Sequence, residues 1–185
     1  MTGRRAAELS PRIGRRAGVD QAALVLATAV AAGLLLRVAG LGWGLPGPER
    51  YYPYHPDEPV LAVAVLQVNF AALQLSPHFY HYGSLSIYLD RLAVDAASRL
   101  GWLRPAPETR EELALTIGDV IRVGRWLTVL MGMLTLLVTA ALGARLYGPP
   151  AGALAALFLA LAPLHLAQGH YFTVDVPAAF WTTLS

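Results

Sequence analysis

The chain has 185 residues, of which 56% are hydrophobic and 14% are charged, and its formal net charge at pH 7 is +2. A soluble domain of this size carries about 25% charged residues, so this composition indicates a chain solvated by lipid. The small net charge and the dispersed arginines argue against a nucleic-acid-binding surface. The absence of cysteine excludes disulfides and thiolate metal sites.

A basic N-terminal tail, residues 1–18, precedes the apolar run AALVLATAVAAGLLL. About 20 residues of helix cross a hydrocarbon core of about 30 Å, so we predict a first span over about 19–40. Because cytoplasmic flanks are rich in arginine, the tail stays inside and the span emerges on the outer face, with Arg37 reaching the interface near its end. A cleaved signal peptide also begins with a basic segment, but no small-residue cleavage site is evident.

The next segment, about 41–118, is predicted to be an outer loop with helices of its own. Its motif HPDEP places Asp57 and Glu58 ahead of an apolar stretch, and one interpretation is that Asp57 caps the helix that follows. The later stretch SLSIYLDRLAVDAASRLGWL has the amphipathic pattern of a helix that lies along the membrane surface. Its apolar face consists of Leu85, Leu89, Leu92 and Leu100.

Further apolar runs predict spans over about 120–145 and 150–168, and the start of another after residue 175. The second span runs inward, the turn RLYGPP lies in the cytoplasm, and the third span runs outward. Because the chain stops inside the last apolar run, we interpret it as the N-terminal piece of a larger protein. The predicted fold class is an all-α polytopic membrane protein with about three complete spans and the start of a fourth.

This topology places two carboxylates, Asp57 and Asp175, on the same membrane face. Asp57 follows the outer end of the first span, and Asp175 follows the outer end of the third. Asp175 is the only acid after Asp119 and stands among apolar residues at an interface, where an ionisable group is costly and commonly functional. From the residues alone, each carboxylate could be a general base, a metal ligand or a helix cap.

Histidines and arginines accompany these acids. The spacing of the five histidines does not match a tight zinc motif, so interfacial or substrate hydrogen-bonding roles are more typical of them. Arg122 and Arg125 either mark the outer end of the second span or bind a lipid-linked phosphate, because arginine binds phosphate in a bidentate manner.

Four segments, in this order along the chain, resemble the membrane glycosyltransferases of the GT-C superfamily. They are HPDEP, HYGSLSIYL, IRVGRWLTVLMGMLTLLVTAALGARLYG and APLHLAQGHYFTVDVPAAFW. The likeness is to family 39 and related transferases that depend on a phospholipid carrier, including the protein O-mannosyltransferases. It implies a GT-C-type helical bundle that transfers a sugar from a polyprenyl-phosphate donor to an acceptor at the non-cytoplasmic face, here the outer face of a bacterial plasma membrane.

The same resemblance implies roles for individual residues. Asp57 and Glu58 would be catalytic, with Asp57 as the base, and Asp57 and Asp175 would hold a divalent metal such as Mg²⁺ or Mn²⁺, or the donor phosphate. The predicted substrate-binding residues are His55, His81, Tyr82, Arg125 and His170. Because HYGSL replaces the His-Pro-Pro form of the eukaryotic-type mannosyltransferases, the acceptor stays open between protein, lipid and glycan, and so does the identity of the sugar.

Two other classes of function stay in view. A transporter would carry acids within its spans, whereas these acids gather at one face. A non-catalytic scaffold would use the acids only as helix caps, which leaves the shared position of Asp57 and Asp175 unexplained. The transferase is therefore favoured, and we expect the segment alone to be inactive, because a site built from two loops needs the remaining helices to enclose it.

Overall fold

The computed structural model describes residues 3–47, 49–105 and 107–185, with only the course of the backbone for residues 3–17. Within these residues the regular secondary structure is entirely helical, which confirms the all-α class. The helices are α1 (Gly3–Ala39), α2 (Asp57–Gln67), α3 (Ser84–Arg99), α4 (Arg110–Tyr147), α5 (Pro149–Leu161), α6 (Pro163–Gln168) and α7 (Asp175–Leu184).

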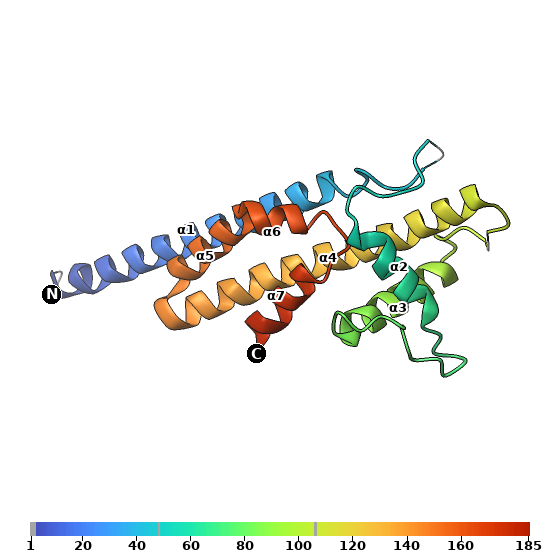
Figure 1. Ribbon diagram of the computed structural model, residues 1–185. Helices are drawn as coiled ribbons and strands as arrows, with labels where there is room; N and C mark the ends of the chain where they lie inside the picture. Colours follow the sequence, from blue (N-terminus) through green and yellow to red (C-terminus); the bar gives the residue numbers. More distant parts are fainter. Residues whose placement is uncertain (1–2, 48, 106) are drawn as a thin grey trace.

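The helices form an elongated bundle (Figure 1). One end carries the additional helices α2 and α3, and we call it the elaborated end. Helices α1 and α5 run in one direction and pack together, while α4 and α7 run the opposite way and also pack together. Helices α2 and α3 lie at the end where α1 finishes and α4 begins, and both contact α4. The loops that carry the HPDEP motif and the segment before α7 meet at this same end.

Among the residues that the structure describes, two helical segments are long and apolar enough to cross a membrane, Gly18–Ala39 and α4. The first agrees with the span predicted over about 19–40, and the second contains the one predicted over about 120–145. With 38 residues, α4 is about 57 Å long, so its first turns extend beyond a hydrocarbon core of about 30 Å. A capping box fixes its start, because the Thr109 hydroxyl accepts from the Glu112 N–H and the Glu112 carboxylate accepts from the Thr109 N–H.

The third predicted span, 150–168, is not one continuous helix. Pro163 disfavours a helical conformation at the residue before it, and Ala162 is extended with ψ 116°, so α5 ends and α6 begins at this point. Helix α5 has 13 residues and a length of about 20 Å, too short to cross a bilayer by itself. The sharp turn predicted at RLYGPP is present, with Gly148 at φ 93° between α4 and α5.

A compact apolar cluster holds α2 and α3 against the N-terminal part of α4. Its buried members include Leu61 and Val65 from α2, Ile87 from α3 and Ile121 from α4, with Phe172 from the loop before α7. Helix α2 ends at Gln67, earlier than the apolar stretch that follows HPDEP, because the chain then folds into a tight turn closed by Asn69 and Gln74. The cluster therefore joins the segment between α1 and α4 to the bundle.

Helix α3 has three faces instead of the two predicted. The buried face consists of Ile87, Asp90, Val94 and Ala97. The predicted apolar face is instead largely exposed at Leu85, Leu92 and Leu100. A charged face carries the predicted ion pair between Arg91 and Asp95, at 2.7 Å. The buried face attaches α3 to the protein and leaves the leucines exposed, as is typical of a helix that lies along a membrane surface.

Asp90 is the one acid on the buried face of α3, with 7% of its surface exposed. It forms no ion pair with any residue that the structure describes. Burial raises the pKa of Asp90 well above its ordinary value of 3.8, because desolvation disfavours the charged carboxylate. Between the ordinary and the raised pKa the folded state binds more protons than the unfolded chain, so the free energy of unfolding falls as pH rises.

We predict that Asp90→Asn raises the apparent Tm of the detergent-solubilised protein at pH 8, because it removes a buried carboxyl whose charged form is disfavoured by desolvation in the folded state. The gain over wild type should shrink as the pH is lowered and vanish below the ordinary pKa of 3.8, where the wild-type carboxyl is protonated in both states. Asp95→Asn, a change of the same kind on the charged face of α3, serves as the control. An Asp90→Asn protein that is no more stable than wild type at pH 8 would contradict the prediction.

Candidate active site

A buried ion pair between Glu58 and Arg125 lies at the elaborated end of the bundle. The Arg125 Nε donates to Glu58 Oε1 at 2.7 Å, and Nη2 donates to Oε2 at 2.8 Å, so the two planar groups meet in a bidentate arrangement. Both side chains are 0% exposed. Bringing two charges out of water is costly, and it is tolerated only where geometry and further hydrogen bonds compensate for it.

Further hydrogen bonds connect this pair to two more segments of the chain. Arg125 Nη1 donates to the carbonyls of Leu41 and Trp43, at 2.8 and 2.7 Å, in the turn after α1. Glu58 Oε1 also accepts from the backbone N–H of Phe172 at 2.8 Å. The pair therefore joins α2, α4, the turn after α1 and the loop before α7 at a single point.

Asp57, the residue before Glu58, is the first residue of α2 and is half-buried. Its backbone N–H donates to His55 Nδ1 at 3.3 Å, and the His55 ring packs against Tyr171 with the centroids 4.9 Å apart. The Tyr171 ring also lies 5.6 Å from the guanidinium carbon of Arg125. The segments around Asp57 and before Asp175 are thus in direct contact, although the chain between them is more than 100 residues long.

The interpretation of Asp57 and Asp175 as helix caps does not hold in the structure. The N-cap residue of α2 is Pro56 and that of α7 is Val174, and neither helix has a side-chain capping hydrogen bond. Each aspartate instead belongs to the first turn of its helix, where acidic side chains interact favourably with the positive end of the helix dipole.

Asp175 is exposed and lines a cavity of about 220 Å³ between α6 and α7. His165 and Gln168 line the same cavity. His165 Nδ1 accepts a hydrogen bond from Arg37 Nη2 at 2.9 Å, which leaves the proton of a neutral imidazole on Nε2. Within the described ranges, His165 Nε2 and Gln168 Oε1 are buried and have no hydrogen-bond partner. One donor and one acceptor are therefore unused beside Asp175.

Arg37 does not extend to the interface as predicted, since its side chain is fully buried in the bundle. Arg37 donates to the carbonyl of Gly33 at 2.9 Å as well as to His165. It forms no ion pair with any residue that the structure describes. Glycines provide the space, because a Cβ at Gly33, Gly132 or Gly169 would approach the Arg37 side chain to between 3.2 and 3.4 Å. Packing between helices thus overrides the expected exposure.

The structure gives the other predicted substrate-binding residues different surroundings. His170 Nε2 donates to the carbonyl of Leu36 at 2.7 Å, which connects the loop before α7 to the end of α1. His81 is exposed and Tyr82 is half-buried, and both rings pack against Phe79. Among the described residues, neither His81 nor Tyr82 forms a hydrogen bond or ring contact with the Glu58–Arg125 pair, so their roles stay predictions.

A metal site built from protein ligands alone is not evident. Among the described residues, no group of three or more His, Cys, Asp or Glu side chains is placed to hold a metal ion. Asp57 and Asp175 could contribute carboxylate oxygens, which suit Mg²⁺ or Mn²⁺, but the remaining ligands would have to come from substrate or water.

In the part of the chain that the structure describes, two helical segments are long and apolar enough to cross a membrane, and a buried Glu58–Arg125 pair lies at one end of the bundle. Residues 111–185 match the family model described as dolichyl-phosphate-mannose-protein mannosyltransferase. This match runs from α4 to α7 and confirms the resemblance to GT-C-type mannosyltransferases over that part of the chain, while HPDEP lies outside it. Searches of curated proteins and of solved structures found no match. The findings support a membrane glycosyltransferase of the GT-C type.

We predict that Glu58→Ala and Arg125→Ala each lower the free energy of unfolding by about 3–5 kcal/mol, because either change leaves an uncompensated buried charge. The double variant should lose less than the sum of the two single losses, since it buries no unpaired charge. Apparent Tm and resistance to proteolysis in detergent would measure these effects. Arg145→Ala, which removes an exposed arginine from the other end of α4, is the matched control. Additive losses would show that the two residues do not stabilise each other.

Proposed function

We propose that this chain forms part of a glycosyltransferase that moves a sugar from a polyprenyl-phosphate donor to an acceptor at the non-cytoplasmic face of a bacterial plasma membrane. The family match over residues 111–185 supports the class of reaction. The hydrogen bond from the Phe172 N–H to Glu58 supports a single site for both aspartates, because it joins the segments of Asp57 and Asp175 at the same end of the bundle. A site at that end suits a donor whose lipid stays in the membrane while its head group meets water.

In this proposal Asp57 is the general base. Its half-buried carboxylate has no hydrogen-bond partner among the side chains and backbone groups that the structure describes, so its oxygens are available to an acceptor hydroxyl. The acceptor oxygen attacks the anomeric carbon of the donor sugar, the bond from that carbon to the phosphate oxygen breaks, and polyprenyl phosphate leaves with the electron pair. Asp57 takes the hydroxyl proton. Because phosphate is a good leaving group, no strong acid is required.

Glu58 and Arg125 then act as positioning residues. Their charges are occupied by each other and by backbone groups, and both side chains are fully buried. The pair fixes the first turn of α2, and with it the backbone of Asp57, against the loop before α7. Rigid support of this kind holds a base in productive geometry.

The cavity beside Asp175 is proposed to bind the head group of the donor. Its unused donor on His165 and unused acceptor on Gln168 match the hydroxyl groups of a sugar, which both donate and accept hydrogen bonds. The buried charge of Arg37, which contacts His165, adds a positive potential that favours the donor phosphate. His55, His170, His81 and Tyr82 remain proposed contributors to substrate binding.

A divalent cation is also retained as a proposal. It would use the Asp57 and Asp175 carboxylates and complete its ligands with donor phosphate and water, so it would bind together with the donor. Its role would be to neutralise charge on the departing phosphate.

We predict that Asp57→Asn lowers sugar transfer by about 10²–10⁴-fold, the usual contribution of a general base. Asp175→Asn should also lower transfer, through loss of binding in the cavity. The measurement is the release of polyprenyl phosphate from labelled polyprenyl-phosphate hexose by membranes that contain equal amounts of each full-length variant. Asp95→Asn, on the charged face of α3, is the control. Unchanged release by both test variants would remove the two aspartates from the reaction.

We predict that excess chelator lowers this release and that added Mg²⁺ or Mn²⁺ restores it, if both aspartates bind a cation with the donor. The restoration should require higher metal concentrations in Asp175→Asn membranes than in wild type. Release that is insensitive to chelator would remove the cation from the proposal and leave the role of Asp57 as a base intact.

A further inference from the structure

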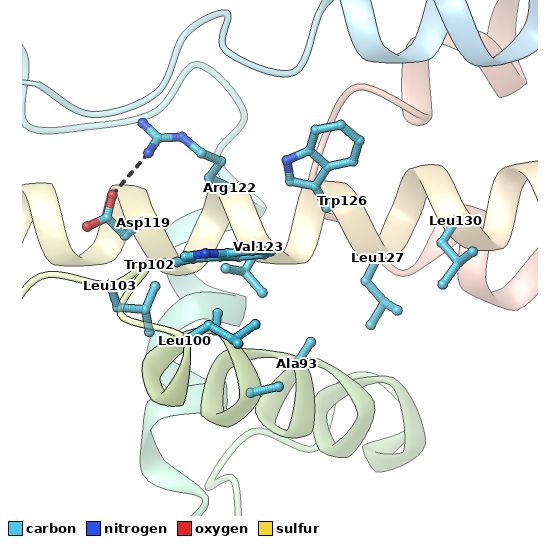
Figure 2. Close-up of a pocket in the computed structure, with 12 residues that line it drawn as sticks. Ala93, Leu100, Trp102, Leu103, Asp119, Arg122, Val123, Trp126, Leu127 and Leu130 are labelled. Carbon is cyan, nitrogen blue, oxygen red and sulfur yellow. Dashed lines mark hydrogen bonds and ion pairs between the residues drawn. The ribbon is translucent and has the colours of Figure 1, made fainter.

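A second cavity, distinct from the candidate active site, opens between α3 and α4 (Figure 2). It has a volume of about 740 Å³, within the range of small-molecule binding sites. We call it the α3–α4 groove, and it is lined by Ala93, Ala96, Ala97, Leu100, Trp102, Leu103, Asp119, Arg122, Val123, Trp126, Leu127 and Leu130. Apart from Asp119 and Arg122, the lining is apolar or aromatic, and none of these residues belongs to the proposed transferase site.

The α3–α4 groove lies at the expected level of the membrane boundary. The uninterrupted apolar part of α4 begins at Trp126, and the last charged residue before it is Arg125. Trp102 and Trp126 both line the groove and are exposed, as is typical of tryptophans at the interface between hydrocarbon and water. Leu127 and Leu130 continue the groove toward the membrane interior, whereas Arg122 lies on the side of the polar region (Figure 2).

The polar end of the groove carries an excess of positive charge. Asp119 is almost fully buried and pairs with two arginines, Arg104 at 3.1 Å and Arg122 at 3.2 Å. Both arginine side chains are about half exposed, at 46% and 52%, so they retain donors that face outward. Two cations share one carboxylate, and the cluster therefore has a net charge of +1.

We propose that the α3–α4 groove binds an anionic glycerophospholipid of the surrounding bilayer. An acyl chain would lie between α3 and the apolar start of the α4 span, and the phosphate would accept hydrogen bonds from Arg122 and Arg104. The apolar part of the cavity complements the acyl chain, and the net positive charge at its polar end complements the phosphate. The bound lipid would fix α3, which carries the exposed Leu85 and Leu92, at the bilayer surface.

The experiment uses tryptophan fluorescence in detergent micelles. The full-length protein with Trp43→Phe and Trp181→Phe keeps Trp102 and Trp126 as the tryptophans of this region. We compare quenching by phosphatidylglycerol with brominated acyl chains and by phosphatidylcholine with the same chains. The expected result is that phosphatidylglycerol half-saturates quenching at a concentration lower by about two- to fivefold, as for one half-exposed ion pair.

Two variants and one control separate the charge from the shape of the groove. Arg122→Gln should bring phosphatidylglycerol to the level of phosphatidylcholine, while Asp119 keeps Arg104 as its partner. Ala93→Leu should weaken quenching by both lipids, because it fills the groove without changing charge. Arg91→Gln removes an arginine from the other side of α3, where it pairs with Asp95, and should leave the preference unchanged.

Several results would overturn the proposal. Equal quenching by the two lipids in wild type, or a preference that survives Arg122→Gln, would show that Arg122 does not recognise a phospholipid. Displacement by polyprenyl phosphate at concentrations well below those of phosphatidylglycerol would assign the groove to the carrier lipid instead. Quenching lost on self-association of the protein would assign the groove to a second copy of the chain.

Discussion

The arrangement of the elaborated end depends on one interaction, the buried ion pair of Glu58 and Arg125. In a low-dielectric interior the desolvation of two charges is compensated only when nearly every donor and acceptor is used. Here Arg125 makes four hydrogen bonds and Glu58 accepts three, including one from the Phe172 N–H. These bonds come from four separate segments, so all four must be in place together for the pair to be stable.

The same constraint brings the candidate site together. Asp57 precedes Glu58 in α2, and Asp175 follows Phe172 by three residues, so each aspartate is close to one end of the network that the pair forms. The pair is buried with its hydrogen bonds saturated, and in the proposed reaction the two nearby aspartates would supply the reactive carboxylates. The neighbouring acids of HPDEP thus have different physical environments, because Glu58 turns into the bundle and Asp57 remains half-exposed.

The different environments of Asp57 and Glu58 show which features of the structure could be predicted from the sequence and which could not. Composition and periodicity predicted the all-α class and the first two apolar helices, because these follow from local hydrophobicity. The common end of Asp57 and Asp175 followed from the rule that successive spans run in opposite directions. They could not show which acid is buried, since that depends on Arg125, which lies 67 residues later in the chain. The break at Pro163 had a visible signal, but the length of the apolar run outweighed it in the prediction of a continuous span.

The burial of Arg37 also depends on residues that are distant in the sequence, because glycines from three separate segments of the bundle leave space for its side chain. Unlike Arg125, it has no carboxylate partner among the described residues, and its contacts are two carbonyls and a histidine. A buried cation without a counter-ion is costly in a membrane protein, and such residues commonly mark a functional site. The unused polar atoms of His165 and Gln168 lie beside it, next to Asp175. An anionic, hydroxyl-bearing ligand would satisfy the charge and both atoms at once, which is the chemistry of a sugar linked to phosphate.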